Sequence, residues 1–204
     1  MARKINSITY TDDLKNVLSA DKNIKIANIK ETVKSLESYA FADCKDLIII
    51  NFPEDLTFIG NLAFIKCESL SEITLPPKIE VIGEGTFFEC KGLEKINLPE
   101  KLRRIGMTAF ERCSSLKEII IPENVTYIGN RAFKECNNLE KVIYKGTLEQ
   151  WEKVNINAEN TKFQKLALKT LYEKEKIIQN IEEELGDTFT KEEINRLALE
   201  EILN

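Results

Sequence analysis

The sequence predicts a repeat solenoid of the α/β class, with short parallel strands on one face, turns or short helices on the other, and a helical extension at the C-terminal end. The first observation is a spacing of 23 residues between successive cysteines, at Cys44, Cys67, Cys90, Cys113 and Cys136. The second is a phenylalanine three residues before each cysteine and a leucine three residues after it. Because one repeat has no partner for its own apolar side, successive repeats must stack into a continuous core.

Each repeat contains one predicted strand and one predicted turn region. Apolar and outward side chains alternate from Ile73 to Leu75, which is the period of a strand. Pro76 ends this strand because proline has no N–H for the next ladder bond. A recurring glycine indicates a turn with positive φ or a close approach of two backbones, at Gly60, Gly83, Gly106 and Gly129. Between this glycine and the phenylalanine and cysteine positions we expect a short helix or a 3₁₀ turn.

The cysteine and phenylalanine columns are interpreted as core. Side chains of one column lie along a line at a strand spacing of about 4.7–4.9 Å, which exceeds the usual Cβ separation in a disulfide, about 3.5–4.5 Å. A structural metal ion needs ligands that converge on one point, and a line of thiols does not converge. Free cysteine packs well as a small buried apolar group. We therefore expect neither a bound metal nor a cofactor.

The repeat consensus L-x-x-I-x-L-P-x-x-[VIL]-x-x-I-G-x-x-[AT]-F-x-x-C-x-x-L closely resembles the BspA-type, or Treponema-type, leucine-rich repeat. Residues 56–78 and 102–124 match it best, and the resemblance extends over residues 27–160. Residues 144–151 are similar to the closing segment of many such arrays. The resemblance implies a leucine-rich-repeat fold and a binding role, because members of the family are often bacterial surface proteins that bind host or matrix proteins, while others occur in protists.

We divide the chain into an N-terminal cap (1–26), a leucine-rich-repeat array of about five 23-residue repeats plus a closing segment (27–160), and an acidic helical hairpin (161–204). Caps are expected because the end repeats would otherwise expose apolar faces and sheet edges. In the N-terminal cap, Thr11 is placed to N-cap a short helix that carries Leu14, Val17 and Leu18 on one face.

Two capping boxes predict helices in the C-terminal part. Residues 147–150 open a helix that carries Trp151, and residues 190–193 open the last helix, whose narrow apolar stripe is interrupted by Glu201. Between them we expect a long helix from about Lys162 to a stop at Gly186, with an apolar stripe formed by Leu168, Leu171, Ile178, Ile181 and Leu185. This hairpin either folds back on the array or on itself, or serves as an element for docking or self-association.

Composition argues against several functions. The net charge of -5 gives no electrostatic reason to expect nucleic acid. The chain has no histidine, and no phosphate-binding loop, dinucleotide fingerprint or nucleophile motif is present, so we predict that it is not an enzyme. No apolar run reaches the roughly 20 residues of a membrane span, and no apolar leader follows Met1. We therefore expect a cytoplasmic location, with the cell surface as the alternative.

The candidate partner-binding residues are outward positions that the repeat does not dictate. The outward strand column changes from polar to apolar after Asn97, at Ile120 and Ile143, and Arg103, Arg104 and Tyr127 follow the neighbouring strands. Arginine and tyrosine are favoured anchors of interfaces. Alternatively, these isoleucines reflect strand propensity, or the C-terminal helices cover them. We predict a non-enzymatic module that binds a protein of unknown identity through the exposed strand face; the alternatives are an adhesin of a bacterium or virus particle and a stoichiometric inhibitor of an enzyme.

Overall fold

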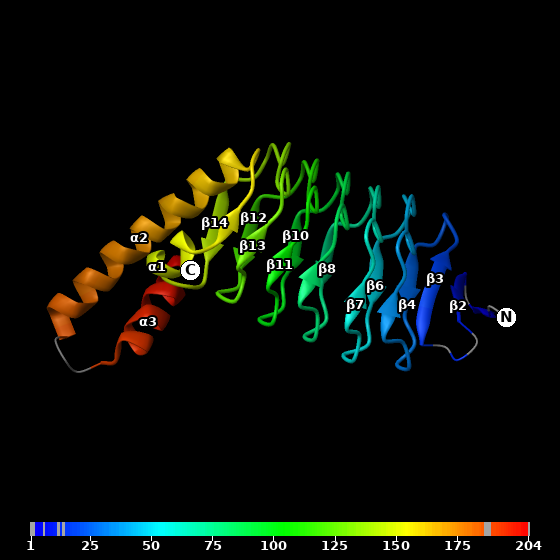
Figure 1. Ribbon diagram of the computed structural model, residues 1–204, viewed down its shortest axis with the longest axis horizontal. Coiled ribbons are helices and arrows are strands. Elements are labelled where there is room, and N and C mark those ends of the chain that lie inside the picture. Colours follow the sequence, from blue (N-terminus) through cyan, green and yellow to red (C-terminus); the bar gives the residue numbers. More distant parts are fainter. Residues whose placement is uncertain (1–2, 6, 12, 14, 186–188, 204) are drawn as a thin grey trace.

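The computed structural model describes residues 3–5, 7–11, 13, 15–185 and 189–203. Figure 1 shows an elongated stack of flat coils, with strands at the N-terminal end and helices at the C-terminal end. The fold class predicted from the sequence, a parallel-strand solenoid with a helical C-terminal region, is confirmed. Between each glycine position and the following cysteine, however, the chain forms a run of turns and not the expected helical turn.

Two rows of parallel strands form the two walls of the array. The long-strand wall contains β4 (Ile26–Asn28), β6 (Ile49–Asn51), β8 (Glu72–Thr74), β10 (Lys95–Asn97), β12 (Glu118–Ile121) and β14 (Lys141–Tyr144). The short-strand wall contains β5 (Ser35–Leu36), β7 (Phe58–Ile59), β9 (Val81–Ile82), β11 (Arg104–Ile105), β13 (Tyr127–Ile128) and β15 (Asn155–Ile156). Equivalent residues of successive repeats are paired, as in Ile96 with Ile73 and Ile105 with Ile82. Both walls point their central isoleucines into one core.

The phenylalanine and cysteine columns form the spine of this core, as the sequence predicts. The rings of Phe64, Phe87 and Phe110 stack with centroids 5.4 Å apart and with nearly parallel planes. The Cys90 thiol donates a hydrogen bond to the carbonyl oxygen of Phe64 at 2.9 Å, and the pattern repeats along the array. All five cysteines are free and buried. Each thiol therefore ties one repeat to its neighbour as well as filling space.

The recurring glycine serves a close approach of backbones. A Cβ built on Gly106 would lie 2.6 Å from the carbonyl carbon of Gly83, a distance that real Cβ atoms do not reach. The positive φ falls two residues later instead, at Leu62, Gly85, Thr108 and Arg131. Of the two roles that the sequence left open, positive φ and close approach, the structure therefore shows close approach of the backbones for this glycine column.

The N-terminal end is closed by strands and not by the predicted helix. Strands β1 (Arg3–Ile5), β2 (Ile8–Tyr10) and β3 (Asn16–Ala20) extend the short-strand wall, with antiparallel pairing up to β3 and parallel pairing from β3 to β5. The helix prediction is wrong because Val17 pairs with Leu36 and is buried in the ladder, and long-range pairing overrides local propensity. Thr11 accepts the N–H of Asn16 within a turn, and Leu14 lies outside the described residues.

The C-terminal end is closed by helices. In α1 (Leu148–Glu152) the predicted capping box is present, and α3 (Lys191–Leu203) begins with the second box, in which the Glu193 N–H donates to Thr190 Oγ1. The long helix α2 (Thr161–Leu185) ends where the sequence predicts; Gly186 lies outside the described residues. Figure 1 shows α2 beside β14 and α3 returning along α2 toward the array. The hairpin thus folds back on the array.

Helix α2 also completes the last repeat with its own side chains. The ring of Phe163 stacks on Phe133 with centroids 4.1 Å apart and an interplanar angle of 3°, so it extends the phenylalanine ladder by one ring. Thr170 Oγ1 donates to the carbonyl oxygen of Val142. Lys174, which is 1% exposed, donates from Nζ to the carbonyl oxygen of Gly146 at 2.7 Å. The helix therefore supplies donors and a ring where a further repeat would have supplied them.

Candidate functional site

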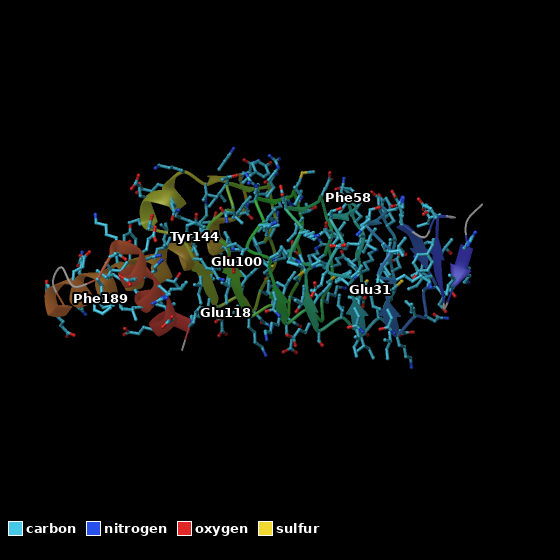
Figure 2. All side chains as sticks on the ribbon, turned by 90° about the horizontal axis from the view of Figure 1, so that it is seen from below. Glu31, Phe58, Glu100, Glu118, Tyr144 and Phe189 are labelled. Atoms are coloured by element: carbon cyan, nitrogen blue, oxygen red, sulfur yellow. The ribbon has the colours of Figure 1, made fainter. Side chains whose placement is uncertain are left out.

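The predicted binding residues lie on two opposite walls. Asn97 and Ile120 lie in the long-strand wall, whereas Arg104 and Tyr127 lie in the short-strand wall. The inward neighbours of both groups share one core, so the outward side chains point in opposite directions. Figure 2 shows the same separation for Phe58 of β7 and Glu118 of β12, which project from opposite sides of the array. The predicted binding residues therefore do not form one continuous surface.

Ile143 must be removed from the candidate site. Its side chain is only 1% exposed, because helix α2 packs over β14, where Thr170 bonds to the carbonyl of Val142. The alternative that the C-terminal helices cover this residue is correct. Ile120, one repeat earlier, stays partly exposed.

Most outward positions of the long-strand wall are used in contacts between repeats. Asn97 Nδ2 donates to Thr74 Oγ1 at 2.8 Å. Opposite charges pair along the same wall, at Lys95 with Glu72 (3.1 Å), Lys117 with Glu94 (3.3 Å) and Lys141 with Glu118 (3.7 Å). These side chains link one repeat to the next, so the wall offers few unengaged groups in its C-terminal half.

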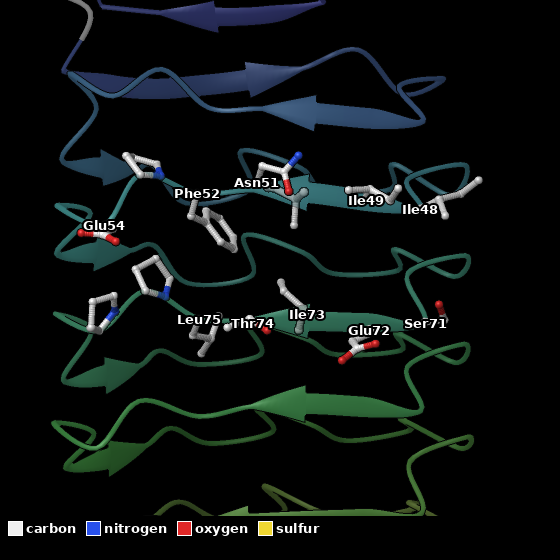
Figure 3. Close-up of a pocket in the computed structure, with 14 residues that line it drawn as sticks. Ile48, Ile49, Asn51, Phe52, Glu54, Ser71, Glu72, Ile73, Thr74 and Leu75 are labelled. Atoms are coloured by element: carbon white, nitrogen blue, oxygen red, sulfur yellow. The ribbon is translucent and has the colours of Figure 1, made fainter.

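The N-terminal half of the long-strand wall also exposes apolar side chains. Ile26, Ile48 and Ile49 are about half exposed, at positions that carry charged or hydroxyl side chains in later repeats. A groove of about 560 Å³ lies between β6 and β8. Figure 3 shows Ile48 and Ile49 at one end of it and Phe52 with Glu54 at the other. The sequence analysis did not select these isoleucines.

The short-strand wall carries a continuous row of outward side chains, which we call the exposed row and define as Phe58, Val81, Arg104 and Tyr127; the first three are exposed and Tyr127 is partly exposed. Phe58 is 54% exposed and Val81 is 45% exposed. Val81, Arg104 and Tyr127 are register partners on adjacent parallel strands. The row therefore presents an apolar half and a cationic-aromatic half side by side on one wall.

Two contacts hold the cationic-aromatic half in place. The Arg104 guanidinium carbon lies 4.3 Å from the centroid of the Tyr127 ring, which is a cation–π geometry. Asn157 Nδ2 donates to the Tyr127 hydroxyl oxygen at 3.0 Å. The tyrosine is thereby fixed before any partner arrives, and this lowers the entropic cost of binding.

Sequence reasoning selected Arg104 and Tyr127 but missed the other two members of the row. Phe58 and Val81 occupy the same repeat position, so the column itself was the available signal. Arg103 precedes the row and is not part of it: its Nε lies 3.7 Å from Glu80 Oε2, and it lines a small cleft of about 270 Å³ beside α1.

Groups with chemical potential are used structurally. Burial raises the pKa of the Cys44 and Cys136 thiols to about 12, which keeps them protonated and unreactive at neutral pH. The buried carboxylate of Glu111 is paired with Arg131 at 2.6 Å. Within the described part of the chain, no group of acidic, cysteine or histidine side chains is arranged to hold a metal ion. Among the helices of that part, none has the length and apolarity to cross a membrane.

A stacked parallel-strand array with a buried Phe and Cys spine and variable walls defines a leucine-rich-repeat protein. The model of the BspA type leucine rich repeat region matches residues 13–140 in six copies, and the chain belongs to this family. The matched region begins inside the segment that the sequence analysis assigns to the N-terminal cap. No curated protein matches the chain.

Solved bacterial proteins share the fold. A leucine rich cell surface protein from Faecalibacterium prausnitzii is similar over 77% of this chain, with 26% identity and a TM-score of 0.72, and this chain spans 43% of that protein. The T. pallidum leucine rich repeat protein is 28% identical, with 67% of each chain covered and a TM-score of 0.61. The pneumococcal vaccine antigen PcpA, 19% identical with a TM-score of 0.67 over 83% of this chain and 45% of its own, shares the fold alone.

Proposed function

We propose that this protein binds a protein partner through the exposed row of the short-strand wall. The family suggests a protein-interaction or surface-protein role, and its fold is typically non-enzymatic. The observation that carries the proposal is the continuity of the row. Phe58 and Val81 leave half of their apolar surface in solvent, and a preorganised Arg104–Tyr127 pair continues the same line. Apolar surface flanked by arginine and tyrosine is the composition of interface hot spots.

A comparison of two matched double variants tests the proposal. Affinity capture from a lysate of the source organism is followed by mass spectrometry, for the parent, for Val81→Asp/Arg104→Glu, and for Thr74→Asp/Lys95→Glu on the long-strand wall. Both double variants change the net charge equally. We expect the row variant to lose a partner that the long-strand variant retains. Retention by the row variant, or loss by both variants with unchanged thermal unfolding, would place the interface elsewhere.

A second candidate function is an adhesin displayed on a cell surface. It is favoured by the similarity to the Faecalibacterium protein, which is described as a cell surface protein. Treatment of intact cells with a protease, followed by immunodetection of residues 150–204, distinguishes the two settings. Cleavage on intact cells supports display, whereas cleavage only after lysis supports the predicted cytoplasmic location.

A further inference from the structure

A groove lies between the three C-terminal helices, on the side of the molecule away from the N-terminal strands. It has a volume of about 460 Å³ and takes its walls from α1, α2 and α3. Figure 1 shows these helices converging beyond the last coil of the array. Ile194 of α3 is 4% exposed and forms the floor. Leu148 and Ile178 are partly buried beside it, so the bottom of the groove is apolar.

The rim of the groove is acidic. It carries four carboxylates and one ammonium group, those of Glu149, Glu152, Glu175, Glu182 and Lys191. The Glu149 carboxylate is paired with Lys153 Nζ at 2.7 Å. Among the residues that the structure describes, the other three carboxylates have no cation at ion-pair distance. Lys174 forms no ion pair with them, and its Nζ is buried against the carbonyl oxygen of Gly146.

Asn195 adds a second observation at the same groove. Its Oδ1 atom is buried and accepts no hydrogen bond from any described residue, although the residue lines the groove beside Ile194. Buried polar atoms in folded proteins nearly always have a partner. At this groove, therefore, one buried acceptor has no donor among the described residues, and carboxylates outnumber ammonium groups.

We propose that this groove binds a cationic amphipathic helix of a partner protein. Such a helix lays an apolar side chain over Ile194, and lysine or arginine side chains one turn away reach the rim carboxylates. Charge complementarity selects this occupant: a partner with an acidic face is repelled, and so is a second copy that presents its own groove. The site is separate from the exposed row and does not depend on the function proposed for it.

A synthetic peptide with leucine and lysine at helical spacing is the probe. It is titrated into the full-length chain, and binding is followed by the anisotropy of a fluorescent label on the peptide and by the emission of Trp151, the single tryptophan, which lies in α1. We expect saturable one-to-one binding that weakens when the ionic strength rises from about 0.05 M to about 0.5 M. The Glu175→Lys/Glu182→Lys variant should weaken binding at least about tenfold.

The matched control is Glu173→Lys/Glu183→Lys, which makes the same charge change on the same helix at exposed positions outside the groove. It should bind the peptide within about threefold of the parent, because exposed charges act weakly over distance. Equal loss in the two double variants would overturn the proposal, and so would equal binding of a scrambled peptide without an apolar face, or no saturable binding.

Two further measurements test whether the groove is independent of the exposed row and whether it serves self-association instead. The exposed-row variant Val81→Asp/Arg104→Glu should bind the peptide like the parent; parallel loss would show that the two sites are one. Light scattering of the chain alone should give a monomer at the concentrations of the titration. A dimer that Glu175→Lys/Glu182→Lys dissociates would assign the groove to self-association and overturn the proposal.

Discussion

The two ends of the array provide hydrogen-bond partners for their last backbone groups in different ways. At the N-terminal end the backbone itself continues the ladder, because β3 pairs with β5 and β2 pairs with β3. At the C-terminal end, side chains provide partners for the last carbonyl groups. Asn160 Nδ2 donates to the carbonyl oxygen of Gly129 at 2.8 Å, and Lys174 Nζ donates to the carbonyl oxygen of Gly146 at 2.7 Å. In both places buried backbone groups find partners, as they must.

This difference determines how each end can fail. In the strand cap, many equivalent backbone hydrogen bonds share the stabilising free energy, and a side-chain substitution removes none of them. In the helical cap, a few side chains provide most of the stabilising free energy, and each of them can be removed by substitution or can change its protonation state. We therefore expect the C-terminal end to respond to single substitutions and to pH, and the N-terminal end to resist them.

The largest expected effect is alkaline destabilisation of the array interior. The pKa of each of the five buried thiols is raised. The unfolded chain therefore releases thiol protons from about pH 9 upward while the folded chain keeps them, up to about pH 12 for Cys44 and Cys136. Stability is lost as the pH rises through this window, by about 1.4 kcal/mol at pH 10 for each of Cys44 and Cys136, and the three thiols between them add to the loss.

Urea unfolding followed by circular dichroism under reducing conditions measures this loss. Cys90→Ala should lower the free energy of unfolding at pH 7. It should also reduce the decrease in that free energy between about pH 8 and about pH 10 by the contribution of one thiol. The C-terminal end should respond with the opposite sign. Burial lowers the pKa of Lys174 below 10.5, so docking of α2 gains stability as the pH rises toward that value. A pH-independent unfolding midpoint would contradict the thiol assignment.

The next largest effect is expected from the ring ladder. Phe110→Ala should destabilise the protein by about 3–5 kcal/mol, because it leaves a cavity between two stacked rings. Phe163→Ala should affect only the C-terminal end, since its ring stacks on the array from one side. Hydrogen exchange distinguishes them: the first should expose amides on both sides of residue 110, and the second only those near α2. Uniform exposure by Phe163→Ala would show that the cap is part of one cooperative unit.

Asn160→Ala should cost about 2–3 kcal/mol at the C-terminal end. The side chain is 3% exposed, accepts the N–H of Phe133 at 3.0 Å and donates to the carbonyl oxygen of Gly129. Removing it leaves a buried donor and acceptor without partners. Chemical denaturation gives the magnitude, and limited proteolysis should then release α2 first. A loss below about 0.5 kcal/mol would mean that water replaces the amide without difficulty.

The smallest effect is expected at the corresponding place in the N-terminal end. Asn16 Oδ1 accepts a hydrogen bond from the Ser35 hydroxyl at 2.7 Å in a partly buried position. Asn16→Ala should cost about 0.5–1 kcal/mol, since the backbone pairing of β3 with β5 stays intact. The same denaturation experiment measures it. If this loss equalled that of Asn160→Ala, the proposed contrast between the two ends would not hold.

The repetitive part of the fold was predictable because its cause is repeated in the sequence. The spacing of Cys90 and Cys113 alone places their thiols in one column, and the Phe and Leu columns follow the same period. The two capping boxes were predictable because their partners are three residues apart. These features depend on local spacing, which a sequence displays directly.

Features that depend on contacts between distant residues were not predictable. Leu102 donates its N–H to the carbonyl oxygen of Pro99 in a turn that separates Asn97 from Arg104 and directs the chain to the opposite wall. Pro99 indicated the end of a strand but not this reversal, so the candidate site was assembled from two walls. The role of Phe163 falls outside the 23-residue period and could not be seen. The strand at Val17 required knowledge of its partner, Leu36.

The stacking of Phe163 on Phe133 has a consequence for the length of the molecule. Phe163 stacks on Phe133 much as Phe133 stacks on Phe110, so this contact does not depend on the number of repeats that precede it. Duplication or deletion of one 23-residue unit within residues 71–116 would lengthen or shorten the rod by one step and leave both terminators with their present neighbours. The length of such a protein can therefore change by whole repeats without a change in the binding surface formed by its C-terminal helices.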